Sequence, residues 1–277
     1  MQLRFIQIAF IYSLIVSSIY SFAADTHGLS QKRDPQTSYT FYTNRKILTQ
    51  QNGLPDALAN PESVHGSARP IDDVDFQNVQ AWESLNELRL GFESIRDVRF
   101  LDDNKNENFK RRSSWLFPDD GCFARAELAN LNLTNWQYKS PNKIFAFGDL
   151  VTKTSNSRSG NVSWWYHVAP IVRVGHEVYV LDPAIEPKRP LEVHEWLARM
   201  GADFTNPVEV AICSSHSYDP VSNCAQGANR SADAYDDQYH FLSEEWTRQI
   251  DLQRDPAQVL GDNPPWRVED IMSGLIL

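Results

Sequence analysis

The apolar pattern of this chain begins with a run from Phe5 to Phe22 that has only small polar interruptions and follows a positively charged start. Small residues at Ser21 and Ala23 close the run before a polar segment. This order is typical of a secretory signal, and it predicts cleavage after Ala23, so that residues 1–23 form the signal. An uncleaved membrane anchor is the alternative because the run approaches the thickness of a bilayer, but its Gln, Ser and Tyr residues weaken that interpretation.

The next segment, residues 24–72, is polar and lacks periodicity, being rich in Gln, Asn, Thr, Ser and Pro. Such a composition does not predict an independent core. Two interpretations stay open: a pro-region that covers an active site, and a simple exposed tail, which the composition favours. We expect a single catalytic domain to follow at residues 73–277.

A helical pattern starts near Asp75, where apolar residues recur at steps of three and four. This spacing predicts one apolar helix face. The positions are Val79, Trp82, Leu85, Leu88, Phe92 and Ile95. The charged stretch from Leu101 to Arg112 that comes next predicts an exposed connector.

Several shorter elements are predicted in the second half of the chain from β-branched runs, helical spacing and glycine stops. They are strands at residues 164–174, 177–181 and 208–212, a helix at residues 191–200 that ends before Gly201, and a last helical stretch after Leu242.

Composition limits the partners that the chain can have. It holds 36 acidic and 26 basic residues, a formal net charge of -10. A nucleic-acid partner would need a basic face, so we expect none. No His or Cys pair has the spacing of a zinc site, and neither a phosphate loop nor a Gly-x-Ser-x-Gly elbow occurs, so we expect no metal and no cofactor. After signal cleavage we expect a monomer without stable membrane association.

The three cysteines are informative because an oxidising compartment should leave one of them unpaired. Cys213 and Cys224 enclose a short loop rich in Ser, Asn, Asp and Pro, and they form the natural disulfide pair. Closing so short a loop stabilises a fold by roughly 2–3 kcal/mol when its geometry is unstrained. Cys122 is then the free thiol.

Cys122 follows a turn at residues 118–121 and opens a run that predicts a helix, with Asp119 or Asp120 as the N-cap. Unpaired backbone N–H groups and the helix dipole favour the thiolate at this position, and the thiolate is the reactive form. The two aspartates oppose that effect. An imidazolium is therefore expected beside the sulfur.

The predicted hairpin provides both an imidazole and a carboxylate. With Gly175 and His176 as a two-residue turn, Val174 lies opposite Glu177, and the same register makes His167 and Asp182 diagonal neighbours on one face. That geometry lets a carboxylate orient an imidazole.

Taken singly, each of these residues is more often structural: a buried cysteine, a half-buried strand histidine and a turn aspartate. A bulge near Pro170 would shift the hairpin register and break the pairing. His216 and His240 stay open as alternative bases on position alone. The joint placement of thiol, imidazole and carboxylate favours the functional interpretation.

These residues also carry a resemblance. The run Pro-Asp-Asp-Gly-Cys-Phe-Ala-Arg-Ala at residues 118–126, the run Trp-x-Tyr-His-Val-Ala at residues 164–169 and the Asp-Pro at residues 182–183 resemble the bacterial protein-glutaminase family. The resemblance covers about residues 79–204. It implies an α+β fold with a transglutaminase- and papain-like core, in which the cysteine helix packs on an antiparallel sheet. It also implies that Cys122 is the nucleophile, His167 the general base and acid, and Asp182 the orienting carboxylate.

Together with the export signal, the resemblance implies a secreted or periplasmic protein-glutamine deamidase that acts on protein or peptide substrates through a thioester. Two alternatives share the triad, namely a transglutaminase and a cysteine protease. A third belongs to another class: an exported binding module in which Cys122 is merely buried.

Overall fold

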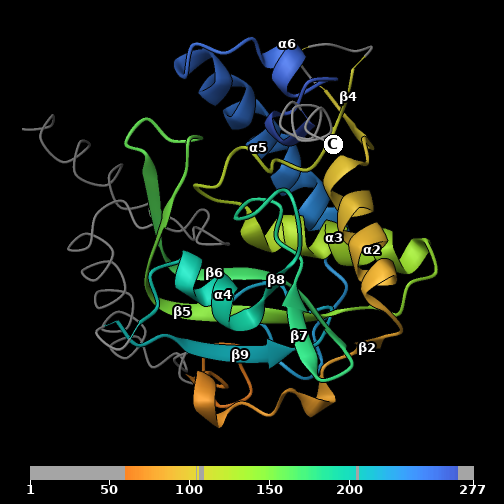
Figure 1. Ribbon diagram of the computed structural model, residues 1–277, viewed down its shortest axis with the longest axis vertical. Helices are drawn as coiled ribbons and strands as arrows, with labels where there is room; N and C mark the ends of the chain where they lie inside the picture. The colour runs from red at the N-terminus through yellow and green to blue at the C-terminus, as the bar shows by residue number, and fades with distance from the viewer. Residues whose placement is uncertain (1–59, 104, 106–108, 204–205, 268–277) are drawn as a thin grey trace, which may run out of the picture.

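The computed structural model describes residues 60–103, 105, 109–203 and 206–267. The predicted signal at residues 1–23 and the polar segment up to residue 59 lie outside these described residues. Within them, a seven-stranded sheet runs in the order β1-β9-β5-β6-β7-β8, with β2 beside β6 (Figure 1). The strands are β1 (Arg69–Pro70), β2 (Ala81–Trp82), β5 (Asn142–Lys153), β6 (Asn161–Val174), β7 (Glu177–Val180), β8 (Leu191–Glu192) and β9 (Glu209–Cys213).

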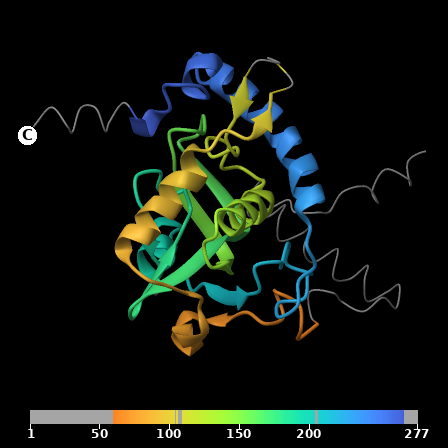
Figure 2. The same cartoon turned by 90° about the vertical axis from the view of Figure 1, so that its right-hand side faces the viewer.

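Helices cover both faces of this sheet (Figures 1 and 2). A separate two-stranded ribbon joins β3 (Leu101–Asp102) to β4 (Lys110–Arg111). The helices are α2 (Leu85–Asp97), α3 (Cys122–Asn135), α4 (Val193–Arg199), α5 (Ser231–Asp251) and α6 (Pro256–Val259), with 3-10 turns η1 (Ile71–Asp73) and η2 (Phe76–Asn78). None of the helices in the described residues is long and apolar enough to cross a bilayer.

Strand alternation assigns the helices to opposite sides of the sheet. Along β5, Ile144 and Ala146 enter the cluster that contains Trp196 of α4. Phe145 and Phe147 enter the cluster that contains Cys122 of α3. Since successive strand residues face opposite sides, α3 and α4 sandwich the central strands.

The long antiparallel pair β5–β6 is the centre of the sheet, and its register shifts at a bulge between Phe147 and Leu150. The hairpin β6–β7 has the predicted register, with Val174 opposite Glu177 and Ile171 opposite Val180. The hairpin prediction is therefore confirmed. Strand β9 and helix α4 also occur where they were predicted, and Gly201 has the left-handed φ of +80° expected after a helix end.

The predicted apolar helix face before residue 97 is only partly right. Helix α2 begins at Leu85, because the hydroxyl of Ser84 caps it by accepting from the backbone N–H of Glu87. Trp82 is buried outside the helix, in a strand that pairs in parallel with β6. Leu85 lies on the solvent side and is 60% exposed.

The prediction of an exposed connector from Leu101 to Arg112 is wrong at both ends. The ends pair as β3 and β4, and Arg111 is fully buried. Its guanidinium forms ion pairs with Asp103 at 2.5 Å and with Glu245 of α5 at 2.6 Å. The sequence predicts that this charged run is exposed to solvent. Part of it is buried instead, because residues distant in the sequence provide ion-pair partners for its charges.

Two more elements differ from the prediction. Helix α5 begins at Ser231, well before Leu242. Strand β5 has no counterpart among the predicted elements, since Gly148 and Asp149 interrupt its apolar pattern at the bulge.

Candidate active site

Cys122 is the first residue of α3, and it is 1% exposed. The N-cap is Gly121, whose φ of +80° is left-handed, so the predicted Asp119 or Asp120 cap is wrong. A Cβ at Gly121 would come within 2.6 Å of the Phe241 ring, so both backbone and space require glycine there. All three cysteines lie in the described residues, and Cys122 is the free one.

The loop before Cys122 is held by side chains from distant elements. The indole N–H of Trp164 donates to the carbonyls of Pro118 at 2.9 Å and Asp119 at 3.1 Å. Arg248 of α5 binds the Asp119 carboxylate through two hydrogen bonds, of 2.6 and 3.0 Å. The negative charge of Asp119 is therefore paired with the Arg248 guanidinium.

Arg125 stabilises the same loop from within α3. Its guanidinium is fully buried and donates to the carbonyls of Asp120 at 2.6 Å and Phe117 at 3.1 Å. The sequence shows this arginine only as part of the motif, because a buried cation that bonds to backbone carbonyls leaves no periodic signal.

His167 and Asp182 lie together, as the hairpin register predicts. His167 is a buried residue of β6, and Asp182 lies just beyond the end of β7. Their Nε2 and Oδ2 atoms are 2.7 Å apart. The other ring nitrogen of His167, Nδ1, is buried and makes no hydrogen bond to another described residue.

The electrostatics of this pair favour an imidazolium beside a carboxylate. Burial lowers the pKa of His167, but the charge and hydrogen bond of Asp182, together with Cys122, outweigh it and raise the pKa to about 9. Burial raises the pKa of Asp182, and the charge and hydrogen bond of His167 outweigh it, so that this pKa is lowered. The pair therefore stays ionised over the neutral range.

Two indoles flank the imidazole. Trp164 stacks on the His167 ring at a centroid distance of 4.7 Å. Trp164 is fully buried, so it supports the imidazole from inside the protein. Trp196 of α4 donates its indole N–H to Asp182 Oδ2 at 2.9 Å. No pattern in the sequence connects Trp196 with the site.

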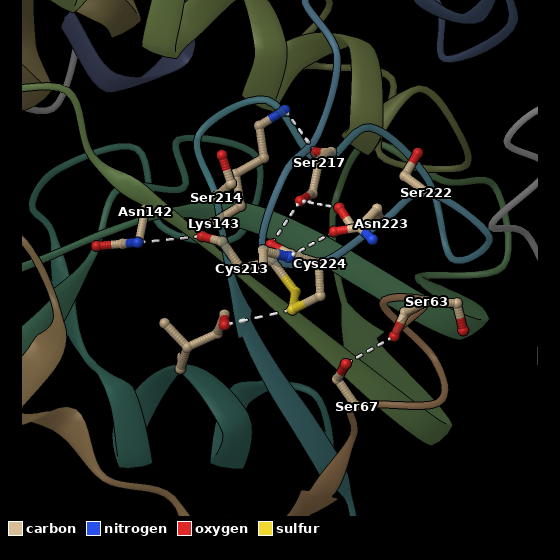
Figure 3. The surroundings of a disulfide bond; sticks show 12 residues. Ser63, Ser67, Asn142, Lys143, Cys213, Ser214, Ser217, Ser222, Asn223 and Cys224 are labelled. Atoms are coloured by element: carbon tan, nitrogen blue, oxygen red, sulfur yellow. Dashed lines mark hydrogen bonds between the residues drawn. A yellow bond between two sulfur atoms is a disulfide. The ribbon is translucent and has the colours of Figure 1, made fainter. Parts of the chain in front are cut away.

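The predicted disulfide between Cys213 and Cys224 is confirmed. Figure 3 shows the loop that it closes, in which the Ser217 hydroxyl donates to the carbonyl of Cys224. Lys143 of β5 fixes the loop by donating to the Ser217 carbonyl at 2.8 Å. A hollow of about 730 Å³ lies beside the disulfide, but none of the three candidate residues lines it.

Among the described residues, the two histidines that the sequence left open as alternative bases, His216 and His240, are both exposed. His194 is exposed, and the His240 ring packs edge-on against Phe241 with centroids 5.3 Å apart. In the part of the chain that the structure describes, no group of three His, Cys, Asp or Glu side chains could hold a metal ion.

Comparison with known proteins agrees with this architecture. Residues 88–200 match the family described as Glutaminase, whereas no curated protein matches the chain.

The crystal structure of a mutant of pro-protein-glutaminase has a TM-score of 0.51 at 19% identity, covering 78% of this chain and 85% of its own. The crystal structure of protein-glutaminase has a TM-score of 0.45 at 22% identity, covering 56% and 85%. The NMR structure of protein-glutaminase from Chryseobacterium proteolyticum has a TM-score of 0.44 at 19% identity, covering 66% and 96%.

The pro-protein-glutaminase likeness confirms the predicted transglutaminase-like α+β fold. The segment that matches the family contains Cys122, His167 and Asp182. On this evidence, residues 88–200 match the glutaminase family, and the chain shares the fold of pro-protein-glutaminase.

Proposed function

We propose that this protein hydrolyses the side-chain amide of glutamine in proteins or peptides, with Cys122 as nucleophile, His167 as acid and base, and Asp182 as the orienting carboxylate. The observation that carries the proposal is the buried His167–Asp182 pair, 2.7 Å apart, within reach of a free thiol at a helix start. A carboxylate-bound imidazole beside a thiol is the arrangement that activates sulfur nucleophiles. The match of residues 88–200 to the family described as Glutaminase supports a glutamine side-chain amide as the substrate.

The reaction starts from a Cys122 thiolate beside a protonated His167. The Cys122 thiolate attacks the glutamine carboxamide carbon, and the carbonyl electron pair moves to oxygen. When the C–N bond breaks, His167 gives its proton to nitrogen and ammonia leaves, which produces a thioester. His167 then takes a proton from water, the hydroxide attacks the thioester, and the sulfur leaves as thiolate while glutamate forms. Backbone N–H groups at the start of α3 stabilise the oxyanion in both steps.

The test is ammonia release from a glutamine-containing peptide by the wild type and by Cys122→Ala, with the mass change from glutamine to glutamate measured in parallel. We expect the variant to lose release completely. His194→Gln alters an exposed histidine and should leave release unchanged. Equal release by the wild type and Cys122→Ala would refute the assignment of the nucleophile.

The same assay separates the alternatives that share the triad. A transglutaminase would incorporate an added primary amine into the peptide, whereas a protease would shorten the peptide chain. We expect an intact peptide and a large excess of ammonia release over amine incorporation. A binding module with a structural cysteine would give neither product.

We also propose that residues 60–72, the described end of the polar N-terminal segment, cover the site. A second proposal is that the enzyme is exported. The disulfide suits an oxidising compartment. Because Cys122 and His167 are each 1% exposed, a substrate amide needs a cover to move before it can reach the sulfur. Val64 is buried in the same apolar cluster as Cys122, and β1 of the same segment extends the sheet by pairing with β9.

Val64→Asp tests the cover, since a buried carboxylate should release residues 60–72 from the core. We expect faster alkylation of Cys122 by iodoacetamide and faster ammonia release than in the wild type. Arg69→Gln, at an exposed position of the same segment, should change neither rate. Unchanged alkylation in a folded Val64→Asp protein would contradict the covering role.

A further inference from the structure

The carboxylate of Asp182 has more donors than His167 alone. Oδ2 accepts from the indole N–H of Trp196 at 2.9 Å and lies 2.7 Å from His167 Nε2. Oδ1 accepts from the backbone N–H of Ala184 at 3.2 Å. Both carboxylate oxygens are thus bonded inside the protein, where an unbonded carboxylate oxygen would be costly.

Trp196 reaches this carboxylate from α4, an element that carries none of the three triad residues. Its side chain is fully buried, and its ring centroid lies 5.8 Å from that of His167. The hairpin delivers His167 and Asp182 to one face of the sheet, and α4 packs on that face just after Asp182 in the chain. The indole therefore connects the packing of α4 to the orientation of the carboxylate.

We propose that Trp196 is a positioning residue for the deamidation reaction: its indole N–H holds the Asp182 carboxylate in the rotation that directs Oδ2 at His167 Nε2. This inference rests on the proposed function. A carboxylate rotates about its last bond unless its oxygens are bonded on both sides. The backbone N–H of Ala184 fixes one oxygen and the indole N–H fixes the other, so that the imidazole keeps Nδ1 directed at the sulfur.

A purely structural Trp196 is the competing explanation, since the residue also packs in the apolar cluster under β5 and β6. The two explanations differ in how they depend on Asp182. A positioning residue acts through the carboxylate, so its removal should matter little once Asp182 no longer orients His167. A structural residue affects the enzyme whether Asp182 is intact or not.

The experiment is a double-mutant cycle of Trp196→Phe and Asp182→Asn, with kcat and KM measured on a glutamine peptide. We expect Trp196→Phe to lower kcat about tenfold, as loss of one hydrogen bond to a charged group does, with KM changed by less than about twofold. In the Asp182→Asn background we expect the same change to lower kcat by less than about twofold.

Trp266→Phe is the matched control, because the Trp266 indole N–H donates to the Asp97 carboxylate at 3.0 Å, away from the triad. It should leave kcat within about twofold of the wild type. Should Trp196→Phe fail to fold, replacement of Trp196 by 3-benzothienylalanine keeps the bicyclic ring and removes only the donor. Unchanged kcat in the Trp196 variant, or a tenfold loss that persists with Asp182→Asn, would overturn the proposal.

A second measurement separates this inference from the proposed function. The NMR signal of the His167 Nε2 proton reports the bond to Asp182 without any turnover. We expect it to broaden or vanish in the Trp196 variant and to persist in Trp266→Phe. A wild type that releases no ammonia would refute the proposed function alone, whereas an unaltered Nε2 signal in the Trp196 variant would refute the positioning role alone.

Discussion

The two halves of the candidate site are built in different ways. His167 and Asp182 are 15 residues apart and are joined by one hairpin, whose register follows from a two-residue turn. The loop that carries Cys122 is instead fixed by α5, more than a hundred residues later in the chain. Local geometry brings the first pair together, whereas the second half depends on the completed tertiary structure.

One face of α5 contacts the loop before Cys122, residues 114–121. Gln238 accepts from the backbone N–H of Ser114 at 3.0 Å, and Glu245 accepts from that of Leu116 at 2.7 Å. Arg248 binds Asp119 one helical turn later. The spacing of 238, 245 and 248 places all three side chains on one stripe of the helix. Substitutions in α5 should therefore affect the cysteine loop more than the hairpin.

The largest expected effect comes from Glu245→Leu. This change leaves the buried Arg111 with Asp103 alone and removes the acceptor of the Leu116 N–H. Breaking a buried ion pair by removing one partner destabilises a protein by about 3–5 kcal/mol, and we expect a loss of that size in the free energy of unfolding, measured in urea.

Glu244→Leu is the control for that loss, because the neighbouring Glu244 is exposed and should change the unfolding free energy by less than about 0.5 kcal/mol. Equal losses in the two variants would show that the buried network does not support the cysteine loop.

The hairpin half should show its electrostatics in the pH dependence of stability. Because the pKa of His167 is raised from 6.5 to about 9, its protonation adds stability that is fully present below pH 6.5 and is lost as the pH rises through about 9. A shift of this size corresponds to roughly 3 kcal/mol. We expect the stability advantage of the wild type over His167→Gln to shrink between pH 6.5 and 9.5, measured by urea unfolding. A constant difference over that interval would contradict the ionised pair.

Arg248→Met tests the link between α5 and the cysteine loop at a partly buried ion pair. We expect it to lower the unfolding free energy by about 2 kcal/mol, the value typical of hydrogen bonds to charged groups, and to slow ammonia release several-fold. Arg158 also pairs with a carboxylate of α5, Asp251, but that pair is exposed, so Arg158→Met should change the stability little. Equal losses of unfolding free energy in the two arginine variants would show that Arg248 does not stabilise the cysteine loop.

The sequence predicts the two halves unequally well, for physical reasons. The hairpin register, the disulfide and the helix start at Cys122 follow from turn chemistry, cysteine number and short-range spacing. The supports of the cysteine loop do not, because Arg125 and Arg248 act as buried cations bonded to carbonyls and to a distant carboxylate. From the sequence, charged residues of this kind are predicted to be exposed to solvent, as Arg111 was. Their burial becomes visible only with their partners in the tertiary structure.

The smallest expected effect is that of Gly175→Ala at the hairpin turn. Gly175 has a left-handed φ of +63°, and a Cβ there meets nothing within 4 Å, so the cost is backbone strain alone, about 1 kcal/mol. The cross-strand pairs from Ile171–Val180 to Val174–Glu177 keep the register, and kcat should therefore stay unchanged while the melting temperature falls slightly. A large loss of kcat in this variant would mean that the position of His167 and Asp182 depends on the turn itself and that the hairpin half is less robust than its pairing indicates.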